Sequence, residues 1–374
     1  MKMCWVLAAL VWAYAGGAAQ AGARPEEGGG GSVGEPRRAS ATAAQQGQRR
    51  MGAVRLVGHS LADDNGPFLG LGVSYFTALW RCKHDQGRLR QDLAFLAKQG
   101  FNYYRMLSMV GYYTAWEGLE IAPVTFRNRG GRRVEACPDY WEQLGRLIDV
   151  AFDEHGLRTQ ITIFADAQLM PSKEARLDHM RKLLEELVPG REQKIILLEV
   201  ANEAWQNGFP GEPGIADLRE FASFLNARTE IPVAITSNHD IASGFDKTYK
   251  GSEADLATWH FSRDRRSDAG WQPVYDCWDY AERLGFPPAI SNEPIGPGSS
   301  VASEKEPIKL VMAAAFGYVA KLPAYVFHCE AGVFGKTLFE DTIGIGQYRP
   351  LLQLLPPDLP NWQRNDGKGT EAPL

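Results

Sequence analysis

The stretch Ile195-Ile196-Leu197-Leu198-Glu199-Val200-Ala201-Asn202-Glu203 is a mostly apolar run that ends in an Asn-Glu pair. A second run, Pro288-Ala289-Ile290-Ser291-Asn292-Glu293-Pro294, carries the same pair ninety residues further along the chain. Short apolar runs of this kind predict strands that are buried on both faces, as in a parallel sheet. Polar residues at the carboxyl ends of such strands lie where α/β barrels have their active sites.

The rest of the chain alternates between apolar runs and segments with helical spacing. Leu89, Leu93, Leu96 and Ala97 follow the helical spacing, and Gly100 is a typical helix end. The sequence predicts strands at 67–76, 101–107, 158–164, 194–201, 231–236, 255–261, 289–292 and 324–329, and helices at 89–99, 140–155, 175–187, 215–227, 273–284 and 308–320.

Eight strand–helix units over roughly 285 residues are typical of a (β/α)8 barrel with insertions. An open doubly wound sheet is the alternative, and it needs a glycine-rich phosphate loop after its first strand. The segment Ser74-Tyr75-Phe76-Thr77 has no such loop. We therefore expect an α/β protein, a (β/α)8 TIM barrel, with a single catalytic domain at 56–350.

The N-terminus has the pattern of a secretory signal peptide at 1–21. Lys2 precedes an apolar stretch at 3–15 and a small-residue exit, and this stretch is shorter than the ~20 residues that span a membrane. We expect a flexible, Gly/Ala/Arg-rich leader at 22–55 and a Pro-rich extended tail at 351–374. These features predict a secreted or periplasmic protein without a membrane span.

Charge and cysteine content restrict the partners. Without residues 1–52, the chain has 34 Lys/Arg and 42 Asp/Glu, a net charge of −8, which argues against nucleic acid as a partner. No Cys-x-x-Cys pair is present, so a zinc ribbon is not expected. In an exported protein Cys82 and Cys137, both expected in loops, are the first disulfide pair to test; Cys277 and Cys329 also remain.

Polar side chains follow nearly every predicted strand. Burying such groups without partners costs a few kcal/mol each, which favours a functional role for the set. In chain order the strand ends carry Tyr75, Arg105, Asp166, Asn202-Glu203, Asn238-His239, His260, Asn292-Glu293 and His328-Cys329-Glu330.

This set resembles the clan of retaining glycoside hydrolases with (β/α)8 barrels, the cellulase- and mannanase-like enzymes. The resemblance covers roughly residues 64–335, with motifs of only a few residues each. It implies that Glu203, after the fourth strand, is the acid/base, and that Glu293, after the seventh, is the nucleophile. It also implies that Arg105 contacts the nucleophile, that Asn202 binds the sugar 2-hydroxyl and that His260 positions the nucleophile. The implied reaction is double displacement on an O-glycosidic bond of a carbohydrate, without a cofactor or metal.

The chain also departs from that pattern. Many members have His-x-Tyr on the sixth strand and Trp at the end of the eighth, where this chain has His260-Phe261-Ser262 and His328-Cys329-Glu330. The departures leave the substrate open and make a standard cellulase or mannanase a poorer match. Asp166, Glu330 or Asp264 are candidates for the missing sugar contacts, and Tyr75 and Asn292 are further expected substrate-binding residues. Of the aromatic residues in expected loops, Trp205 is the best candidate to stack on a sugar.

Two other functions remain as alternatives. One is a metal-dependent barrel hydrolase with ligands among His239, Asp240, His260 and His328, although the usual His-x-His of the first strand is missing. The other is a carbohydrate-binding barrel that has lost catalysis. Glycan binding without hydrolysis would distinguish this second alternative from an enzyme.

Overall fold

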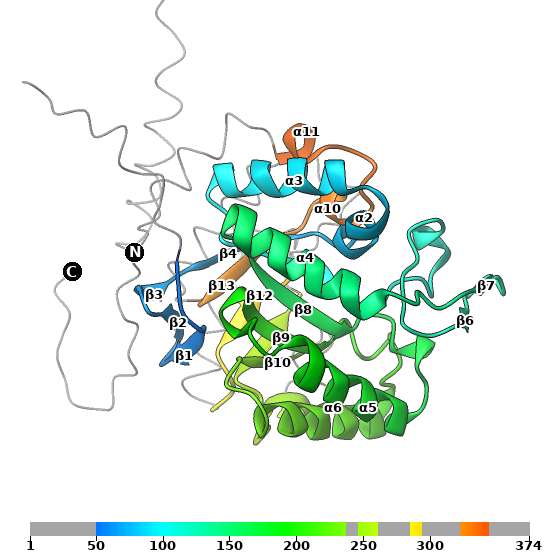
Figure 1. Cartoon of the computed structure of the whole chain (residues 1–374). Helices are drawn as coiled ribbons and strands as arrows, with labels where there is room; N and C mark the ends of the chain where they lie inside the picture. Colours follow the sequence, from blue (N-terminus) through cyan, green and yellow to red (C-terminus); the bar gives the residue numbers. More distant parts are fainter. Residues whose placement is uncertain (1–49, 237–245, 261–284, 294–321, 344–374) are drawn as a thin grey trace, which may run out of the picture. The chain divides into compact units, whose positions relative to one another are not determined.

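A closed barrel of eight parallel strands forms the centre of the computed structural model, which describes residues 50–236, 246–260, 285–293 and 322–343 (Figure 1). Each strand pairs with the next in chain order, and the last pairs with the first. The strands are β4 (Gly70–Ser74), β5 (Tyr103–Leu107), β8 (Arg158–Phe164), β9 (Ile195–Ala201), β10 (Val233–Thr236), β11 (Leu256–Trp259), β12 (Ala289–Ser291) and β13 (Ala324–Phe327). The eight predicted strands and the (β/α)8 fold are confirmed.

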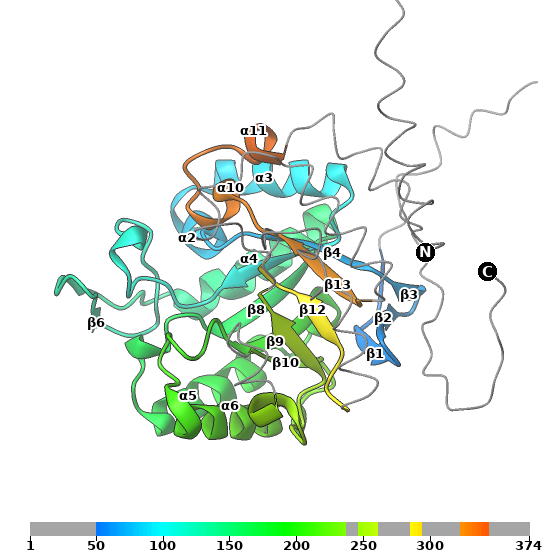
Figure 2. The ribbon, with the colours of Figure 1, turned by 180° about the vertical axis from the view of Figure 1, so that it is seen from behind.

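Helices surround the barrel where the chain is described (Figures 1 and 2). Gly100 and Gly156 end two of them with positive φ angles of 97° and 71°, a conformation that glycine adopts without strain. The predicted helix at 175–187 continues beyond α5 as a π-helical turn, Leu183–Leu187. The helices are α2 (Ala78–His84), α3 (Gln86–Gln99), α4 (Tyr140–His155), α5 (Lys173–Lys182), α6 (Gly211–Asn226), α10 (Glu330–Val333) and α11 (Phe339–Ile343). Short 3-10 helices lie at Thr114–Trp116, Ala167–Leu169 and Glu192–Lys194. The helices predicted at 273–284 and 308–320 lie outside the described residues.

The barrel wall separates two cores, because successive side chains of a strand point to opposite faces. Tyr104 and Met106 pack with the helices, whereas Tyr103 packs with Leu197 and Ile290 inside the barrel. Arg105 shares the inner face with Tyr103, so it points into the barrel toward the carboxyl ends of the strands.

A small antiparallel sheet that the sequence did not predict precedes the barrel. It consists of β1 (Arg55–Val57), β2 (Ser60–Asp63) and β3 (Gly66–Phe68), and the expected first strand at 67–76 is in fact divided between β3 and β4. Leu61 and Phe68 of this sheet belong to the inner core, so the sheet covers the barrel at the end where the strands begin. A second hairpin, β6 (Phe126–Arg127) and β7 (Arg133–Val134), lies between β5 and α4.

The packed structure begins earlier than the expected boundary at residue 56. Val54 is buried in the inner core, and Arg50 forms an ion pair with Asp63 at 2.8 Å. Residues 50–55 are therefore part of the fold and not of a flexible leader. Residues 1–49 and the expected tail at 351–374 lie outside the described part.

The expected Cys82–Cys137 disulfide is absent from the structure. Cys82 lies in α2, not in a loop, and its buried Sγ is 3.5 Å from the backbone oxygen of Gln143 in α4. Cys137 lies 3.2 Å from the carboxylate of Asp139 instead. The prediction failed because the segment after the first strand forms a helix that packs on α4. Cys277 is outside the described residues. No helix among the described residues has the length and apolar character needed to cross a membrane.

Candidate active site

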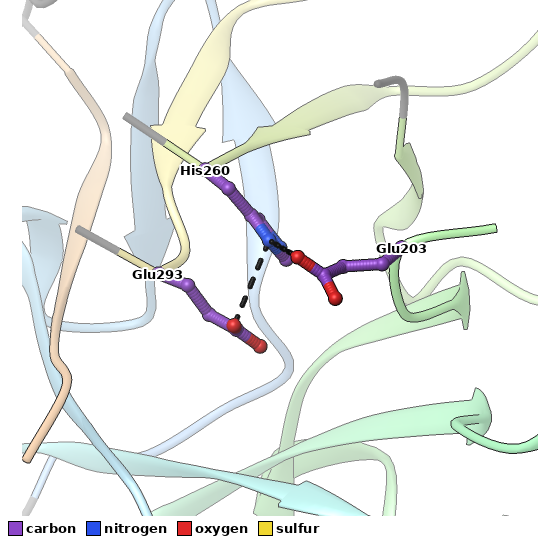
Figure 3. Close-up of side chains that lie close together, drawn as sticks. All are labelled: Glu203, His260 and Glu293. Atoms are coloured by element: carbon purple, nitrogen blue, oxygen red, sulfur yellow. Dashed lines mark hydrogen bonds and ion pairs between the residues drawn. The ribbon is translucent and has the colours of Figure 1, made fainter. Parts of the chain in front are cut away.

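Two carboxylates face each other at the carboxyl ends of the barrel strands. Glu203 follows β9 and Glu293 follows β12, and His260, directly after β11, lies between them (Figure 3). One oxygen of each carboxylate and one nitrogen of His260 all lie within 4.8 Å of one another. The side chains of Glu203 and Glu293 are 17% and 7% exposed, so both are largely buried without being sealed from solvent. The structure thus brings together the two acids that the sequence indicated.

The backbone at Glu203 is strained. Its φ angle is 38°, and among the described residues it is the one non-glycine residue with a positive φ. Such a conformation costs on the order of 1–3 kcal/mol and persists where the surroundings enforce it. Here the Asn207 side chain donates to the Asn202 carbonyl at 2.9 Å, and the Glu203 carbonyl accepts from the amide of Gln206 at 3.0 Å. This turn directs the Glu203 side chain toward His260.

Arg105 connects the two strand ends that carry the carboxylates. Its guanidinium donates to Glu293 Oε1, to Asn202 Oδ1 at 2.7 Å and to Glu199 Oε2 at 2.9 Å. Burial alone would lower the pKa of Arg105, but the charges of Glu199 and Glu293 outweigh it, so the pKa is raised. Arg105 therefore places a permanent positive charge against Glu293, as the sequence indicated.

Glu199 is a buried residue of this site that the sequence analysis missed. Its carboxylate accepts from Thr162 Oγ1 at 2.5 Å, from Gln160 Nε2 at 3.3 Å and from Asn292 Nδ2 at 2.8 Å. Since a buried charge is tolerated only with partners, these bonds and Arg105 keep it in the barrel interior. The available signal was an acidic residue in the middle of an apolar strand.

Two histidines lie beside Glu293. Nδ1 of His260 is 3.2 Å from Glu203 Oε1 and 3.6 Å from Glu293 Oε2. Nε2 of His328, after β13, is 3.7 Å from the same Glu293 oxygen, and its Nδ1 is 2.8 Å from Ser74 Oγ. From the sequence, His328 was a strand-end residue and a candidate metal ligand, and its contact with Glu293 was not expected.

The charges around Glu293 favour its ionised form. Burial alone would raise the pKa of Glu293, but His260, Arg105 and His328 outweigh it, so the pKa lies below its usual value. Burial alone would lower the pKa of His260, but Glu293 and Glu203 outweigh that effect, and the pKa is raised. Proton sharing in the cluster therefore leaves Glu293 as a carboxylate and favours a protonated His260.

The remaining predicted substrate contacts divide into two groups. Asn202 and Trp205 lie at the site: Asn202 binds Arg105, and the ring of Trp205 is 6.3 Å from that of His260 in an edge orientation. Asn292 is completely buried beneath the carboxylates, where it bonds Gln160 and Glu199. It therefore supports the site from below and cannot contact a sugar.

Three further predicted contacts bind other parts of the protein. Tyr75 is fully buried and donates to Asp92 in α3 at 2.7 Å, because it points to the outer face next to the inward-facing Ser74. Asp166 accepts from the amides of Gly111 and Tyr112 at 2.8 and 2.9 Å, and burial raises the pKa of Asp166 to about 6. Glu330 accepts from the amides of Lys336 and Thr337. Because Tyr75 is fully buried, it cannot contact a sugar, whereas the roles of Asp166 and Glu330 as sugar contacts stay predictions. Asn238, His239, Asp240 and Asp264 lie outside the described residues.

The fold is similar to that of known glycoside hydrolases. The endo-β-1,4-mannanase from Thermotoga petrophila matches 82% of this chain and 78% of its own, with a TM-score of 0.56 and 14% identity. A glycoside hydrolase family 5 protein from Bacteroides vulgatus matches with a TM-score of 0.52 and 13% identity, and 76% of this chain corresponds to 64% of that one. The endo-1,4-β-mannanase from Rhizomucor miehei matches 74% of this chain and 90% of its own, with a TM-score of 0.51 and 14% identity. No protein-family model and no curated protein matches the sequence. At these identities the comparisons establish the fold, which is the (β/α)8 barrel of the cellulase- and mannanase-type enzymes.

Proposed function

We propose that this chain is a retaining glycoside hydrolase that cleaves β-linked O-glycosidic bonds by double displacement. The observation that carries the proposal is the approach of Glu203 and Glu293 to within 4.8 Å at the carboxyl end of the barrel. Carboxyl groups about 5–5.5 Å apart suit a covalent intermediate, whereas inversion needs a wider gap for a water molecule.

The surroundings of each carboxylate support distinct roles. Glu293 is held ionised by Arg105, His260 and His328, as a nucleophile requires. Glu203 shares a hydrogen bond with His260, a group that can exchange a proton with it. Glu203 is thus assigned as acid/base and Glu293 as nucleophile.

The chemistry of the site and the comparisons support a choice of substrates to test first. Trp205 beside His260 provides an aromatic surface of the kind that stacks on sugar rings. Because solved structures with this fold include mannanases, β-1,4-mannan and manno-oligosaccharides are the first substrates to test. His328 stands where many such enzymes place a tryptophan, so other β-glycans belong in the same screen. The N-terminal sequence supports the further proposal that the protein is secreted.

The experiment is a hydrolysis screen of β-glycans and aryl β-glycosides with the wild-type protein and Glu203→Ala. Removal of the acid should cost most where the leaving group needs a proton, so Glu203→Ala should lose activity on natural glycans. The same variant should retain much more activity on aryl glycosides with acidic leaving groups. Equal losses on both classes would contradict the acid/base role. Glycan binding without hydrolysis by the wild-type protein would favour the carbohydrate-binding alternative.

A further inference from the structure

Glu203, His260 and Glu293 have a spacing that suits a metal ion as well as a sugar. A tetrahedral zinc ion with bonds of about 2.0–2.1 Å keeps neighbouring ligand atoms roughly 3.3 Å apart. Nδ1 of His260 is 3.2 Å from Glu203 Oε1 and 3.6 Å from Glu293 Oε2 (Figure 3), and the two carboxylate oxygens lie within 4.8 Å of each other. In the part of the chain that the structure describes, these are the three side chains of ligand type whose donor atoms converge in this way.

We propose that these three residues form an inhibitory binding site for a divalent transition-metal ion such as Zn²⁺ or Cu²⁺. Three protein ligands with an open fourth position for water are a common arrangement for zinc. The binding of the ion is independent of the proposed glycosidase function, whereas the inhibition rests on it.

The charges of the cluster match a divalent ion. The carboxylates of Glu203 and Glu293 supply two negative charges, and the nearby Arg105 is paired with Glu199 at 2.9 Å. His260 must release the proton on Nδ1 when that nitrogen binds the ion. Arg105 occupies Glu293 Oε1, while His260 and His328 lie at Oε2. Oε2 is therefore the oxygen that faces the ion.

His328 lies beside that oxygen. Its Nε2 is 3.7 Å from Glu293 Oε2, and its other ring nitrogen is 2.8 Å from Ser74 Oγ. Outer contacts of this kind orient the ligands of metal sites and strengthen binding. His328 is thus a positioning residue for the ion.

The donor set selects among ions. One imidazole nitrogen and two carboxylate oxygens suit Zn²⁺ and Cu²⁺, and affinity increases toward Cu²⁺ along the first-row divalent series. Ca²⁺ takes 6–8 oxygen ligands, and Mg²⁺ requires an octahedral shell with several waters. We therefore expect neither Ca²⁺ nor Mg²⁺ to compete for the site.

Bound metal should prevent catalysis directly. A carboxylate that donates its electron pair to the ion can act neither as nucleophile nor as proton donor, so the ion should compete with the substrate. Inhibition should be reversed when a chelator removes the ion.

The test is calorimetric titration of the metal-free full chain with ZnCl₂, with MgCl₂ and CaCl₂ as comparisons. We expect one zinc ion per chain at this site and an affinity lowered about tenfold or more in Glu203→Gln and in His260→Gln. His84→Gln is the matched control, because His84 is exposed at the end of α2 and stacks on Trp80 away from the site. Its zinc affinity should equal that of the wild type.

Because Glu203 is partly exposed, Glu203→Gln tests the site without removing the buried imidazole of His260. Circular dichroism shows whether each variant is folded. The proposed site would be overturned if the wild-type protein did not bind zinc at millimolar concentration. It would also be overturned if both folded variants bound zinc with the wild-type affinity. Wild-type hydrolysis that continues unchanged with zinc bound would overturn the inhibition. If zinc binding required both Glu203 and His260 but the wild-type protein hydrolysed no glycoside, the ion site would stand. The proposed glycosidase function would then be contradicted.

Discussion

Glu293 is the residue on which most of the site converges. Arg105 contacts one of its carboxylate oxygens, and two imidazoles lie at the other. A nucleophile needs this environment, because only the ionised carboxylate can attack a sugar carbon. The extra histidine at position 328 means that the lowered pKa of Glu293 depends on Arg105 and two histidines together.

Replacement of His328 should therefore change the pH dependence of the reaction. His328 helps to lower the pKa of Glu293, so His328→Gln should raise that pKa. The sign follows directly: the nucleophile becomes protonated at a higher pH, and the acidic limb of the kcat/KM profile moves upward. Each pH unit of this movement corresponds to about 1.4 kcal/mol.

The measurement is the pH profile of kcat/KM on an aryl glycoside. His84→Gln removes an exposed imidazole that is not among the groups that shift the pKa of Glu293, so it should leave the acidic limb where it is. An acidic limb that stays unchanged in His328→Gln would show that His328 has no part in the ionisation of Glu293.

The direction of each side chain decided whether its role could be predicted from the sequence. Glu203, His260 and Glu293 were found because they follow apolar strands, and Arg105 was found because it is a charged residue within one. Tyr75 also ends a strand, but it points outward because Ser74 before it points inward. Position at a strand end does not reveal which face of the strand a side chain lies on. For this reason Tyr75 was taken as a site residue, and Glu199 on the inner face of β9 was missed.

At the scale of elements, the eight barrel strands were predictable because each is a short apolar run between breaks. β1 and β2 were missed because these strands have only three or four residues each and contain polar side chains, and most of β3 was merged with β4 into one predicted strand. Their side chains gain stability from contact with residues distant in sequence, such as Tyr103 and Ile196. A local pattern carries no information about such contacts.

The contact between β4 and β5 inside the barrel leads to a stability prediction. A Cβ atom at Gly72 would lie 2.3 Å from the ring of the buried Tyr103, far closer than any side chain permits. Gly72→Ala should therefore lower the free energy of unfolding by about 1–3 kcal/mol. The measurement is urea-induced unfolding.

Gly87→Ala is the matched control for that substitution. Gly87 lies in α3 with open space around its Cβ position, and alanine is the better helix former by up to about 1 kcal/mol. We expect this variant to be as stable as the wild type or more so. A Gly72→Ala protein with wild-type stability would contradict the close packing described between these strands.

At the scale of the whole barrel, the two ends have different roles. The carboxyl end carries the carboxylates, and the amino end is covered by the small sheet β1–β3. A buried ion pair connects that sheet to the barrel: Asp63 of β2 accepts from Arg158 of β8 at 2.8 Å and from Arg50 at the same distance. The cover is therefore held to the barrel by charge as well as by Leu61 and Phe68.

Removal of Asp63 should weaken the fold without altering the site directly. Asp63→Ala leaves the buried Arg158 without its carboxylate, and the loss of one partner from a buried pair costs about 3–5 kcal/mol. Asp64→Ala is the control, because the Asp64 side chain is 70% exposed and its ion pair with the exposed Arg55 is long, at 4.0 Å. Thermal unfolding of both variants measures the difference. Equal stability of the two would contradict a structural role for the cover.

The assignment of Glu293 as the attacking group is tested most directly by chemical rescue of Glu293→Ala with azide. Alanine removes the nucleophile and leaves space beside Arg105, so activity on an aryl β-glycoside should disappear. Added azide should restore turnover and yield the α-glycosyl azide, because a single displacement inverts the sugar carbon. A variant that retains wild-type turnover, or a rescued product with the β configuration, would contradict the account.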